Sequence, residues 1–354
     1  MAVRKKTKTI YIRNVPVGGG NPVAVQSMTK TDTADVKSTI GQIKSLESSG
    51  CEIIRLAVPD RNAAKVLGVI KKSIAIPLIA DIHFDWRLAL DAIRQGVDGL
   101  RINPGNIGAK WKVKEVIAAA QDKGIPIRIG VNAGSLEKEL LRKYGHPTPE
   151  ALVESAARHI GILEEFRFCD IKVSLKASDV LKTVEAYRLF SKRYDYPLHV
   201  GISEAGPPSV GIIKSSVGLG ILLAEGIGDT IRVSLTADPR EEVRVAYAIL
   251  GSLGLRQRGV NIISCPTCGR CKIDLRNLVA RVEERVKHIE NPVTIAVMGC
   301  VVNGPGEARE ADFGMAGGKG RGILFKKGEI IKRVKEEELL DAFLEEIGKG
   351  GGAV

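Results

Sequence analysis

The sequence has few aromatic residues and no long apolar run. Phenylalanine, tryptophan and tyrosine together make up 4% of the 354 residues. This scarcity argues against a protein that binds single-stranded nucleic acid by stacking bases on aromatic rings. No uninterrupted apolar run approaches the roughly 20 residues that a membrane-spanning helix needs. The basic start "MAVRKKTKTIYIRN" lacks the apolar core of a signal peptide. These features predict a cytoplasmic protein that does not enter membranes.

Cysteine is also scarce and is unevenly placed. Four of the six cysteines lie between residues 265 and 300, which is not the spread of a disulfide framework. In a reducing compartment, clustered thiols indicate metal ligands or redox groups. The other two, Cys51 and Cys169, each come just before a predicted strand, and we expect both to be small buried side chains.

Positive charge is abundant. The formal net charge of +12 indicates an anionic partner, which is a nucleic acid, a phosphorylated substrate or an acidic protein. The alternative is a solvated lysine-rich surface, as in "KKGEIIKRVKEE" at 326–337. Charge alone does not choose between these two interpretations.

Short apolar runs alternate with helical stretches through most of the chain. Runs rich in Val, Ile and Leu that alternate with helices indicate parallel strands buried on both faces. Eight such units predict a (β/α)₈ barrel, with a doubly wound open sheet as the main rival. The runs lie at 23–28, 52–58, 77–81, 98–103, 126–132, 170–176, 197–203 and 230–235.

Two domains are predicted, a barrel at 1–258 and a small α+β domain at 259–354. The segment "TIYIRNVPVGGGNPVAV" before the barrel predicts an extra hairpin that turns at its glycines. A linker, "GLRQRG" at 254–259, precedes the second domain. We expect that domain to contain a strand leading into Cys265, a helix at 274–288, a strand at 294–299, a hairpin turning at 327–328 and a helix near 336–347.

Polar and basic residues occupy the ends of the predicted strands. Function in such barrels lies at the carboxyl ends of the strands. A single residue of this kind most often forms an ion pair on the surface. A single histidine such as His83 is most often a polar residue with its own hydrogen-bond partners and no catalytic role. Several cations around one mouth repel each other without an anion, and they suit a substrate with two phosphates. The residues are Arg55, Asp81, His83, Arg101, Asn103, Arg128, Asn132, Lys172, Lys176, Ser203, Glu204, Arg232 and Ser234.

The cysteine cluster has a spacing typical of metal ligands. Cys265, Cys268 and Cys271 follow a Cys-x₂-Cys-x₂-Cys pattern, and Cys300 comes later. This spacing favours an iron–sulfur cluster. A zinc ribbon is the alternative, and on a basic chain it indicates a module that contacts RNA. The combination with a phosphate-lined barrel favours redox catalysis.

Several longer motifs carry a family resemblance. The segments "SCPTCGRC", "VMGCVVNGPGEA", "VQSMTKTDT", "ADIHFD" and "LRINPGNIG" resemble the 4-hydroxy-3-methylbut-2-enyl diphosphate synthases of the methylerythritol phosphate pathway to isoprenoids. The resemblance extends over essentially the whole chain. It implies a barrel fused to an α+β domain that carries a [4Fe–4S] cluster. It also implies the reductive ring opening of 2-C-methyl-D-erythritol 2,4-cyclodiphosphate with two electrons.

The resemblance further implies the roles of individual residues. By motif, the cluster ligands are Cys265, Cys268, Cys300 and Glu307, whereas spacing alone selects Cys271 as the fourth ligand. An oxygen ligand is displaceable and leaves one iron available to substrate. Glu204 is implied as an acid for the hydroxyl lost as water, with a structural ion pair as the alternative. The implied substrate contacts are Asp81, Arg101, Asn103, Arg128, Asn132, Lys176, Glu204, Arg232 and Ser234.

The implied partners follow from the same resemblance. Electrons come from a flavodoxin or a ferredoxin, and because these carriers are typically acidic, part of the positive charge steers their docking. The last barrel helix runs antiparallel to the strands, so the chain leaves the barrel at the end opposite the mouth. We therefore expect a homodimer in which each cluster domain serves the barrel of its partner. The competing hypothesis is a phosphate-binding barrel with a zinc ribbon that contacts RNA.

Overall fold

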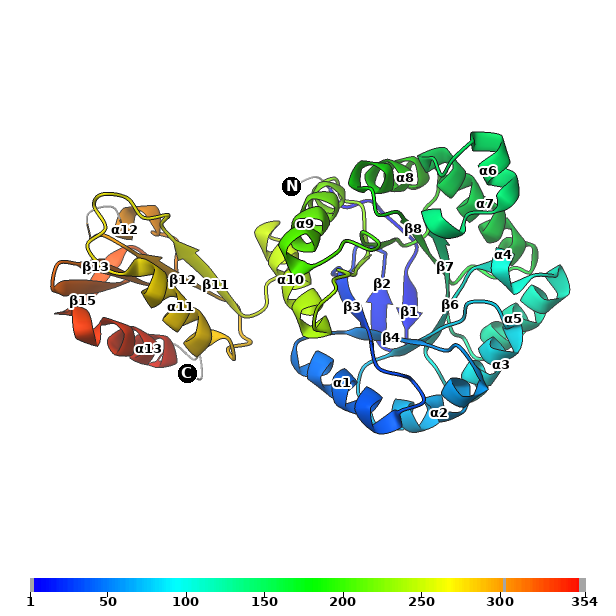
Figure 1. Ribbon diagram of the computed structural model, residues 1–354, viewed down its shortest axis with the longest axis horizontal. Helices are drawn as coiled ribbons and strands as arrows, with labels where there is room; N and C mark the ends of the chain where they lie inside the picture. The colour runs from blue at the N-terminus through cyan, green and yellow to red at the C-terminus, as the bar shows by residue number, and fades with distance from the viewer. Residues whose placement is uncertain (1–2, 302–303, 350–354) are drawn as a thin grey trace. The chain divides into compact units, whose positions relative to one another are not determined.

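The structure, a computed structural model, describes residues 3–301 and 304–349 in two units that divide between Arg256 and Gln257. In the first unit, eight parallel strands form one sheet in the order β8-β7-β6-β5-β4-β3-β10-β9. A parallel bridge between Val173 and Leu198 joins its first and last strands and closes the barrel. Figure 1 shows the helices in a ring around the strands. The predicted (β/α)₈ barrel is confirmed, and the open doubly wound sheet is excluded.

Each of the eight apolar runs contains one barrel strand. Their Val, Ile and Leu side chains pack against the surrounding helices in one continuous core. The strands are β3 (Ala24–Met28), β4 (Ile53–Ala57), β5 (Leu78–Asp81), β6 (Gly99–Ile102), β7 (Ile127–Asn132), β8 (Ile171–Lys176), β9 (His199–Val200) and β10 (Thr230–Ile231).

The helices of the barrel begin at the carboxyl ends of the strands. Aspartate caps fix several of these starts, because a carboxylate accepts from backbone N–H groups that have no partner inside the helix. Asp60 accepts from Ala63, and Asp238 accepts from Arg240. The helices are α1 (Val36–Ser48), α2 (Arg61–Lys72), α3 (Trp86–Arg94), α4 (Pro104–Ile107), α5 (Lys110–Asp122), α6 (Lys138–Tyr144), α7 (Pro149–Glu165), α8 (Val180–Arg193), α9 (Pro208–Ala224) and α10 (Pro239–Ser252).

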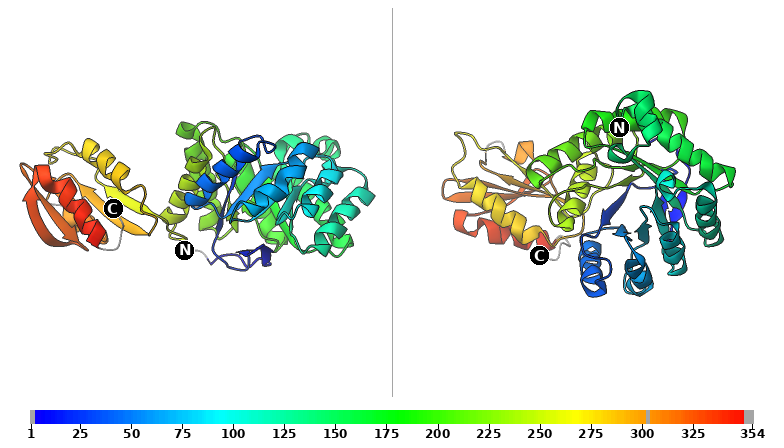
Figure 2. Two further views of the ribbon diagram at one scale, coloured as in Figure 1. Left: turned by 90° about the horizontal axis from the view of Figure 1, so that it is seen from below. Right: turned by 45° about the vertical axis from the view of Figure 1, so that its right-hand side comes forward.

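A hairpin covers the end of the barrel where the strands begin. Its strands β1 (Ile10–Ile12) and β2 (Val15–Val17) pack onto the first inward-facing residues of β3, β4 and β5. Figure 2 shows the hairpin, in dark blue, at one end of the barrel. The hairpin is confirmed, but its predicted turn is wrong. The chain turns at residues 13–14, with Arg13 at φ 56°, and the three glycines at 18–20 instead lead from β2 toward β3.

The interior of the barrel is unusually polar. Barrels of this kind are commonly filled with branched apolar side chains. Here Ile171, Val173 and Leu175 of β8 belong to the core shared with the helices. Because side chains alternate along a strand, Lys172 and Lys176 face the interior, and both are buried. An interior that buries charge points to a binding site.

The second unit is a five-stranded sheet with helices against it. The strand order is β11-β12-β13-β14-β15, with β11, β12 and β13 parallel and the last two strands antiparallel. Helices α11 and α13 share a core with Val297, Met315 and Leu324 on one face of the sheet. No helix in the described residues is long and apolar enough to cross a membrane. The elements are β11 (Val260–Ser264), α11 (Leu275–Val286), β12 (Val293–Met298), α12 (Gly304–Glu307), β13 (Phe313–Gly318), β14 (Arg321–Lys326), β15 (Glu329–Lys335) and α13 (Leu339–Lys349).

The predicted elements of the second unit are confirmed, and one strand was missed. The strand into Cys265, both helices and the hairpin that turns at Lys327 and Gly328 are all present. The missed strand is β13, "FGMAGG", which lacks the branched residues typical of strands. Packing explains its glycines. A Cβ at Gly314 would meet the Phe325 ring at 2.0 Å, and one at Gly317 would meet Ile273 at 2.2 Å.

Candidate active site: the barrel mouth and the cysteine loops

Six cationic side chains point into the barrel from five strands or their ends. Two carboxylates, Asp81 and Glu242, are buried among them. A third buried carboxylate, Asp229, is paired with Arg4 at 3.1 Å and precedes β10. The cations therefore outnumber the carboxylates that face them, and the site has a net attraction for anions. The six are Arg55, Arg101, Arg128, Lys172, Lys176 and Arg232.

Asp81 organises part of this charge. Its carboxylate lies 3.1 Å from Arg101 Nη1 and 3.5 Å from Arg55 Nε. The half-exposed ring of His83 lies 3.7 Å from the same carboxylate. Burial raises the pKa of Asp81, but the attraction of Arg55, Arg101 and Arg128 outweighs burial and leaves the pKa below its usual value. Asp81 is therefore a carboxylate that fixes two guanidinium groups.

The remaining cations lack such compensation. Burial, followed by the repulsion of Arg55 and Arg101, holds the pKa of Arg128 well below its ordinary value. Burial and the charges of Arg128 and Arg232 act in the same direction on the pKa of Lys176. Within the described residues, the Nε atoms of Arg101, Arg128 and Arg232 have no hydrogen-bond partner. Buried donors without partners are costly, and phosphate oxygens would satisfy them.

Two glycines make room for these side chains. A Cβ at Gly130 would lie 2.5 Å from Arg101 Nε, so Arg101 crosses β7 only because position 130 has no side chain. A Cβ at Gly201 would lie 2.7 Å from Lys176 Nζ. Sequence reasoning missed both glycines, since the signal is a contact between neighbouring strands rather than a motif.

The other predicted substrate contacts lie around the mouth. Asn103 is buried and accepts from the N–H of Gly105 at 3.1 Å. Asn132 accepts from Arg101 Nη2 at 3.2 Å when its amide is oriented to satisfy both of its polar atoms. Ser234 is half-buried after β10. Asn132 thus contacts a cation directly, whereas Asn103 and Ser234 each lie two positions beyond one along the chain, after Arg101 and Arg232.

Glu204 lies in the loop after β9 and differs from the rest of the site. It is exposed, and its φ of 52° is left-handed, which is uncommon outside glycine. The neighbouring Ser203 N–H donates to Ala177 O at 3.1 Å, which ties this loop to the loop after β8. Strained backbone of this kind is often found at functional sites.

Glu242 is a site residue that the strand-end pattern did not reveal. It lies on α10, is 2% exposed and accepts from the Leu235 N–H at 3.0 Å. Lys30 Nζ lies 3.0 Å from its carboxylate, and the Ser27 hydroxyl donates to it at 3.4 Å. Its charge opposes the effect of burial on the pKa of Arg232. The acidic first turn "PREE" of α10 is the sequence feature from which Glu242 could have been predicted as a site residue.

The cysteines gather where β11 and β12 end. These strands are parallel neighbours with Ser264 opposite Val297, so Cys265 and Cys300 follow the same edge of the sheet. The Gly299 N–H donates to Cys265 Sγ at 3.4 Å. Cys271 also lies against Gly299, where a Cβ would meet its Sγ at 2.6 Å, and it donates to Ile273 O at 3.3 Å.

Arg270 favours the thiolate form in this loop. Its backbone N–H and then its guanidinium lower the pKa of Cys268. The hydrogen bond to Cys268, followed by the charges of Cys268 and Cys300, in turn raises the pKa of Arg270. Glu307 is exposed at the end of α12. Over residues 3–301 and 304–349, no three His, Cys, Asp or Glu side chains already surround a common metal position. The donors nevertheless fit an iron–sulfur cluster chemically, because thiolates are its usual ligands.

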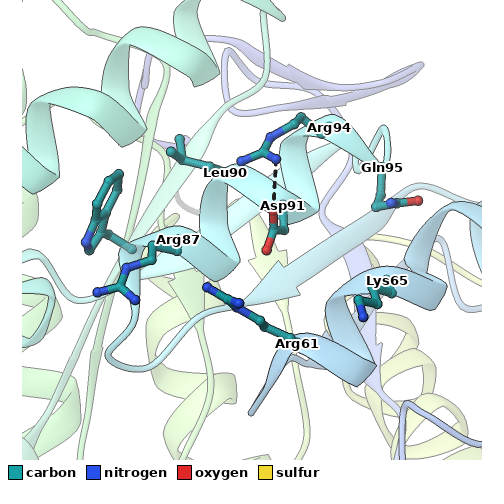
Figure 3. A pocket seen from close by; sticks show the side chains of 8 residues that line it. Arg61, Lys65, Arg87, Leu90, Asp91, Arg94 and Gln95 are labelled. Atoms are coloured by element: carbon teal, nitrogen blue, oxygen red, sulfur yellow. Dashed lines mark ion pairs between the residues drawn. The ribbon is translucent and has the colours of Figure 1, made fainter.

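A separate basic pocket lies on the outer wall of the barrel between α2 and α3 (Figure 3). Its volume is about 450 Å³. Its one carboxylate, Asp91, lies 3.1 Å from Arg94. Four cations thus surround one paired carboxylate. The lining residues are Arg61, Lys65, Trp86, Arg87, Leu90, Asp91, Arg94 and Gln95.

Comparison with known proteins finds two family domains, which correspond to the two units of the structure. The GcpE TIM-barrel domain matches residues 7–247, and the GcpE protein C-terminal domain matches residues 261–349. The chain belongs to the GcpE family. A Thermodesulfovibrio yellowstonii protein named 4-hydroxy-3-methylbut-2-en-1-yl diphosphate synthase (flavodoxin) is 66% identical, over 99% of this chain and all of its own. Proteins of the same name from Geobacter sulfurreducens and Symbiobacterium thermophilum are 61% and 57% identical, over 98% of this chain and 98% and 93% of theirs.

Among solved structures, the likeness extends to the fold alone. A dihydropteroate synthase from Stenotrophomonas maltophilia superposes with a TM-score of 0.50 at 10% identity, over 69% of this chain and 98% of its own. An N-acetylneuraminic acid synthetase from Leptospira borgpetersenii superposes with a TM-score of 0.50 at 13% identity, over 79% of this chain and 96% of its own.

Proposed function

We propose that this enzyme converts 2-C-methyl-D-erythritol 2,4-cyclodiphosphate to (E)-4-hydroxy-3-methylbut-2-enyl diphosphate, an isoprenoid precursor. The name shared by relatives that are 57–66% identical along nearly the whole chain carries this conclusion. The excess of buried cations in the barrel mouth supports it, because it matches a substrate with two phosphates. The family match favours this reaction over the alternative of an RNA-binding zinc ribbon.

The barrel residues bind the diphosphate and stabilise its charge. Arg101, Arg128, Lys176 and Arg232 hold the phosphates, and Asp81 keeps two guanidinium groups in place. As a carbon–oxygen bond of the ring breaks, the diphosphate gains negative charge, and preorganised cations stabilise it. Asn103, Asn132 and Ser234 orient the remaining oxygens. Glu204 protonates the hydroxyl that leaves as water, and the carbon skeleton takes up two electrons.

A [4Fe–4S] cluster is proposed as the cofactor, held by Cys265, Cys268, Cys300 and Glu307. Such a cluster supplies electrons one at a time and, with an oxygen ligand, one exchangeable iron position. The family motif leaves Cys271 out of the proposed ligand set, and its thiol donates to Ile273 O at 3.3 Å. We place the enzyme in the cytoplasm, where free thiols remain reduced.

Flavodoxin is the proposed electron donor, as the names of the relatives indicate. Flavodoxins are typically acidic, and the basic pocket between α2 and α3 offers complementary charge. Arg61, Trp86 and Arg87 lie at the first turns of these helices, which is the mouth side of the barrel.

A homodimer with shared sites is proposed as the working assembly. Arg256, the last residue of the barrel unit, donates to Val23 O at 2.8 Å and to Glu52 at 2.6 and 3.0 Å. Both partners precede strands, so this contact holds the chain at the end opposite the mouth. Residues 257–259 extend at most about 10 Å, whereas the 14 residues of α10 rise about 21 Å. The short linker therefore does not bridge the distance from the chain's exit to the barrel mouth, and a cluster unit supplied by the partner does not need to.

Anaerobic purification tests the cofactor and the reaction together. We expect a brown protein that contains iron and sulfide in equal amounts and that opens the cyclic diphosphate when reduced flavodoxin is supplied. A colourless, zinc-loaded protein that leaves the cyclic diphosphate unchanged would contradict the proposal.

A further inference from the structure

Lys172 is a buried basic side chain below the mouth that the proposed mechanism does not use. It is the second residue of β8, it is 1% exposed, and it lies in register with Arg128 of β7. Its Nζ has no hydrogen-bond partner within the part of the chain that the structure describes. A buried ammonium without a counterion is strongly disfavoured.

His199 lies near Lys172 on β9 and is fully buried. Its Nδ1 lies 2.7 Å from the Thr230 hydroxyl, and its Nε2 has no partner among the described residues. Burial, then the charges of Lys176, Arg128 and Lys172, hold the pKa of His199 well below its ordinary value. An imidazole is neutral or positive, so His199 supplies no countercharge to Lys172 on this side.

The charges that face Lys172 come from several elements. Arg128 on β7 and Arg55 on β4 repel it, whereas Asp229 before β10 attracts it. Asp229 is already paired with Arg4. Burial, Arg128 and Arg55 together hold the pKa of Lys172 well below its ordinary value. An anion bound beside Arg128 and Arg55 offsets their repulsion and raises the proton affinity of the Lys172 amine.

We propose that Lys172 gains a proton from solvent when the cyclic diphosphate enters the barrel mouth, so that substrate binding is coupled to proton uptake. The coupling rests on the proposed function. Phosphate oxygens neutralise the field of Arg128 and Arg55, and an ammonium then forms at Lys172. The charge of this ammonium, which lies behind the guanidinium groups, strengthens binding of the diphosphate. Lys172 is therefore a positioning residue for the reaction.

The direction of the pH dependence follows from linkage. Bound anion raises the proton affinity of Lys172, so the complex holds more protons than the free enzyme between the two titration points. Binding therefore weakens as pH rises through that window. Arg128 and Arg232 do not produce this effect, because guanidinium groups stay protonated in proteins.

Calorimetry tests the coupling. The cluster-loaded enzyme without reductant is titrated with the cyclic diphosphate at one pH, in two buffers that differ in ionisation enthalpy. The difference in observed heat gives the number of protons taken up. Both phosphates of the cyclic diphosphate are strong acids and stay ionised, so the protein accounts for the uptake. We expect uptake approaching one proton per site in the wild type.

Three variants locate the proton. Lys172→Met should bind more weakly and without proton uptake, and Lys172→Arg should retain binding without uptake, because its charge is permanent. Lys44→Met, on the exposed face of α1, is the matched control and should behave as the wild type. If Lys172 only supported the fold, Lys172→Arg would not keep substrate binding while losing proton uptake.

Each alternative result has a distinct meaning. Binding to the wild type without proton uptake would overturn the coupling and leave the proposed function intact. Uptake that persists in Lys172→Met would also overturn it, since Lys176 or His199 would then be the acceptor. No binding to the cluster-loaded wild type would overturn the substrate assignment and the coupling with it.

Discussion

Replacing Asp81 with asparagine should destabilise the barrel, and an anion should restore much of the loss. Asp81 is 3% exposed and lies within 3.5 Å of two buried guanidinium groups. Removing one partner of a buried ion pair leaves an unpaired charge and costs roughly 3–5 kcal/mol. For a unit of this size that corresponds to a fall in Tm of roughly 6–20 °C, at about 2–4 °C per kcal/mol.

Thermal unfolding of the barrel, with and without inorganic diphosphate, is the assay. Diphosphate supplies the countercharge that Asp81→Asn removes, so the variant should gain more in Tm from diphosphate than the wild type does. Asp91→Asn is the matched control, because Asp91 also pairs with an arginine at 3.1 Å but lies on the surface of α3. An exposed pair contributes about 1 kcal/mol or less, so this variant should unfold nearly as the wild type does.

The comparison separates charge from packing. If Asp81→Asn unfolds as the wild type does, the carboxylate is not what holds the two guanidinium groups. A large loss that diphosphate leaves unchanged would instead indicate a packing defect, and the excess-cation description of the mouth would be wrong.

Three further outcomes are expected. Arg232→Ala should keep the cluster spectrum and lose activity about 10- to 100-fold, since a charge-assisted contact contributes roughly 1.5–3 kcal/mol; wild-type kinetics would remove Arg232 from the site. Cys271→Ser should keep its iron in metal analysis whereas Cys268→Ser loses it, and equal loss in both would contradict Glu307 as a ligand. Mixing the weakened Arg232→Ala with cluster-free Cys268→Ser under subunit exchange should raise activity above that of Arg232→Ala alone, and a mixture with confirmed heterodimers but no such gain would show that each chain uses its own cluster.

The barrel is predictable from the sequence because its signals are local. Each strand has branched apolar residues facing the helices, and the polar strand ends need only alternation to place them in the mouth. The same local pattern predicts that Arg101, Arg128 and Lys176 face the mouth. The depth of these side chains is not predictable, because burial depends on how the barrel closes and on the hairpin that covers its other end.

Other features depend on contacts between distant segments, and sequence reasoning failed there. The first hairpin turns at Arg13, which is left-handed, while Gly18 and Gly19 lie so close to Lys8 and Thr9 that a side chain would not fit there. Cys169, expected to be buried, is exposed before β8, whereas Cys51 is buried as expected. Gly130 and Gly201 become meaningful only once Arg101 and Lys176 are seen to cross the neighbouring strands.

The most direct test of the central claim is ring opening measured per cluster. Wild type and Arg128→Ala are loaded anaerobically to equal iron content and supplied with reduced flavodoxin and the cyclic diphosphate, and phosphorus NMR follows the substrate. Because the two proteins then contain the same amount of cluster, any difference in rate comes from the substitution in the barrel mouth. We predict linear 4-hydroxy-3-methylbut-2-enyl diphosphate from the wild type and little from Arg128→Ala. Equal rates in the two proteins would place the substrate outside the barrel mouth and contradict the account.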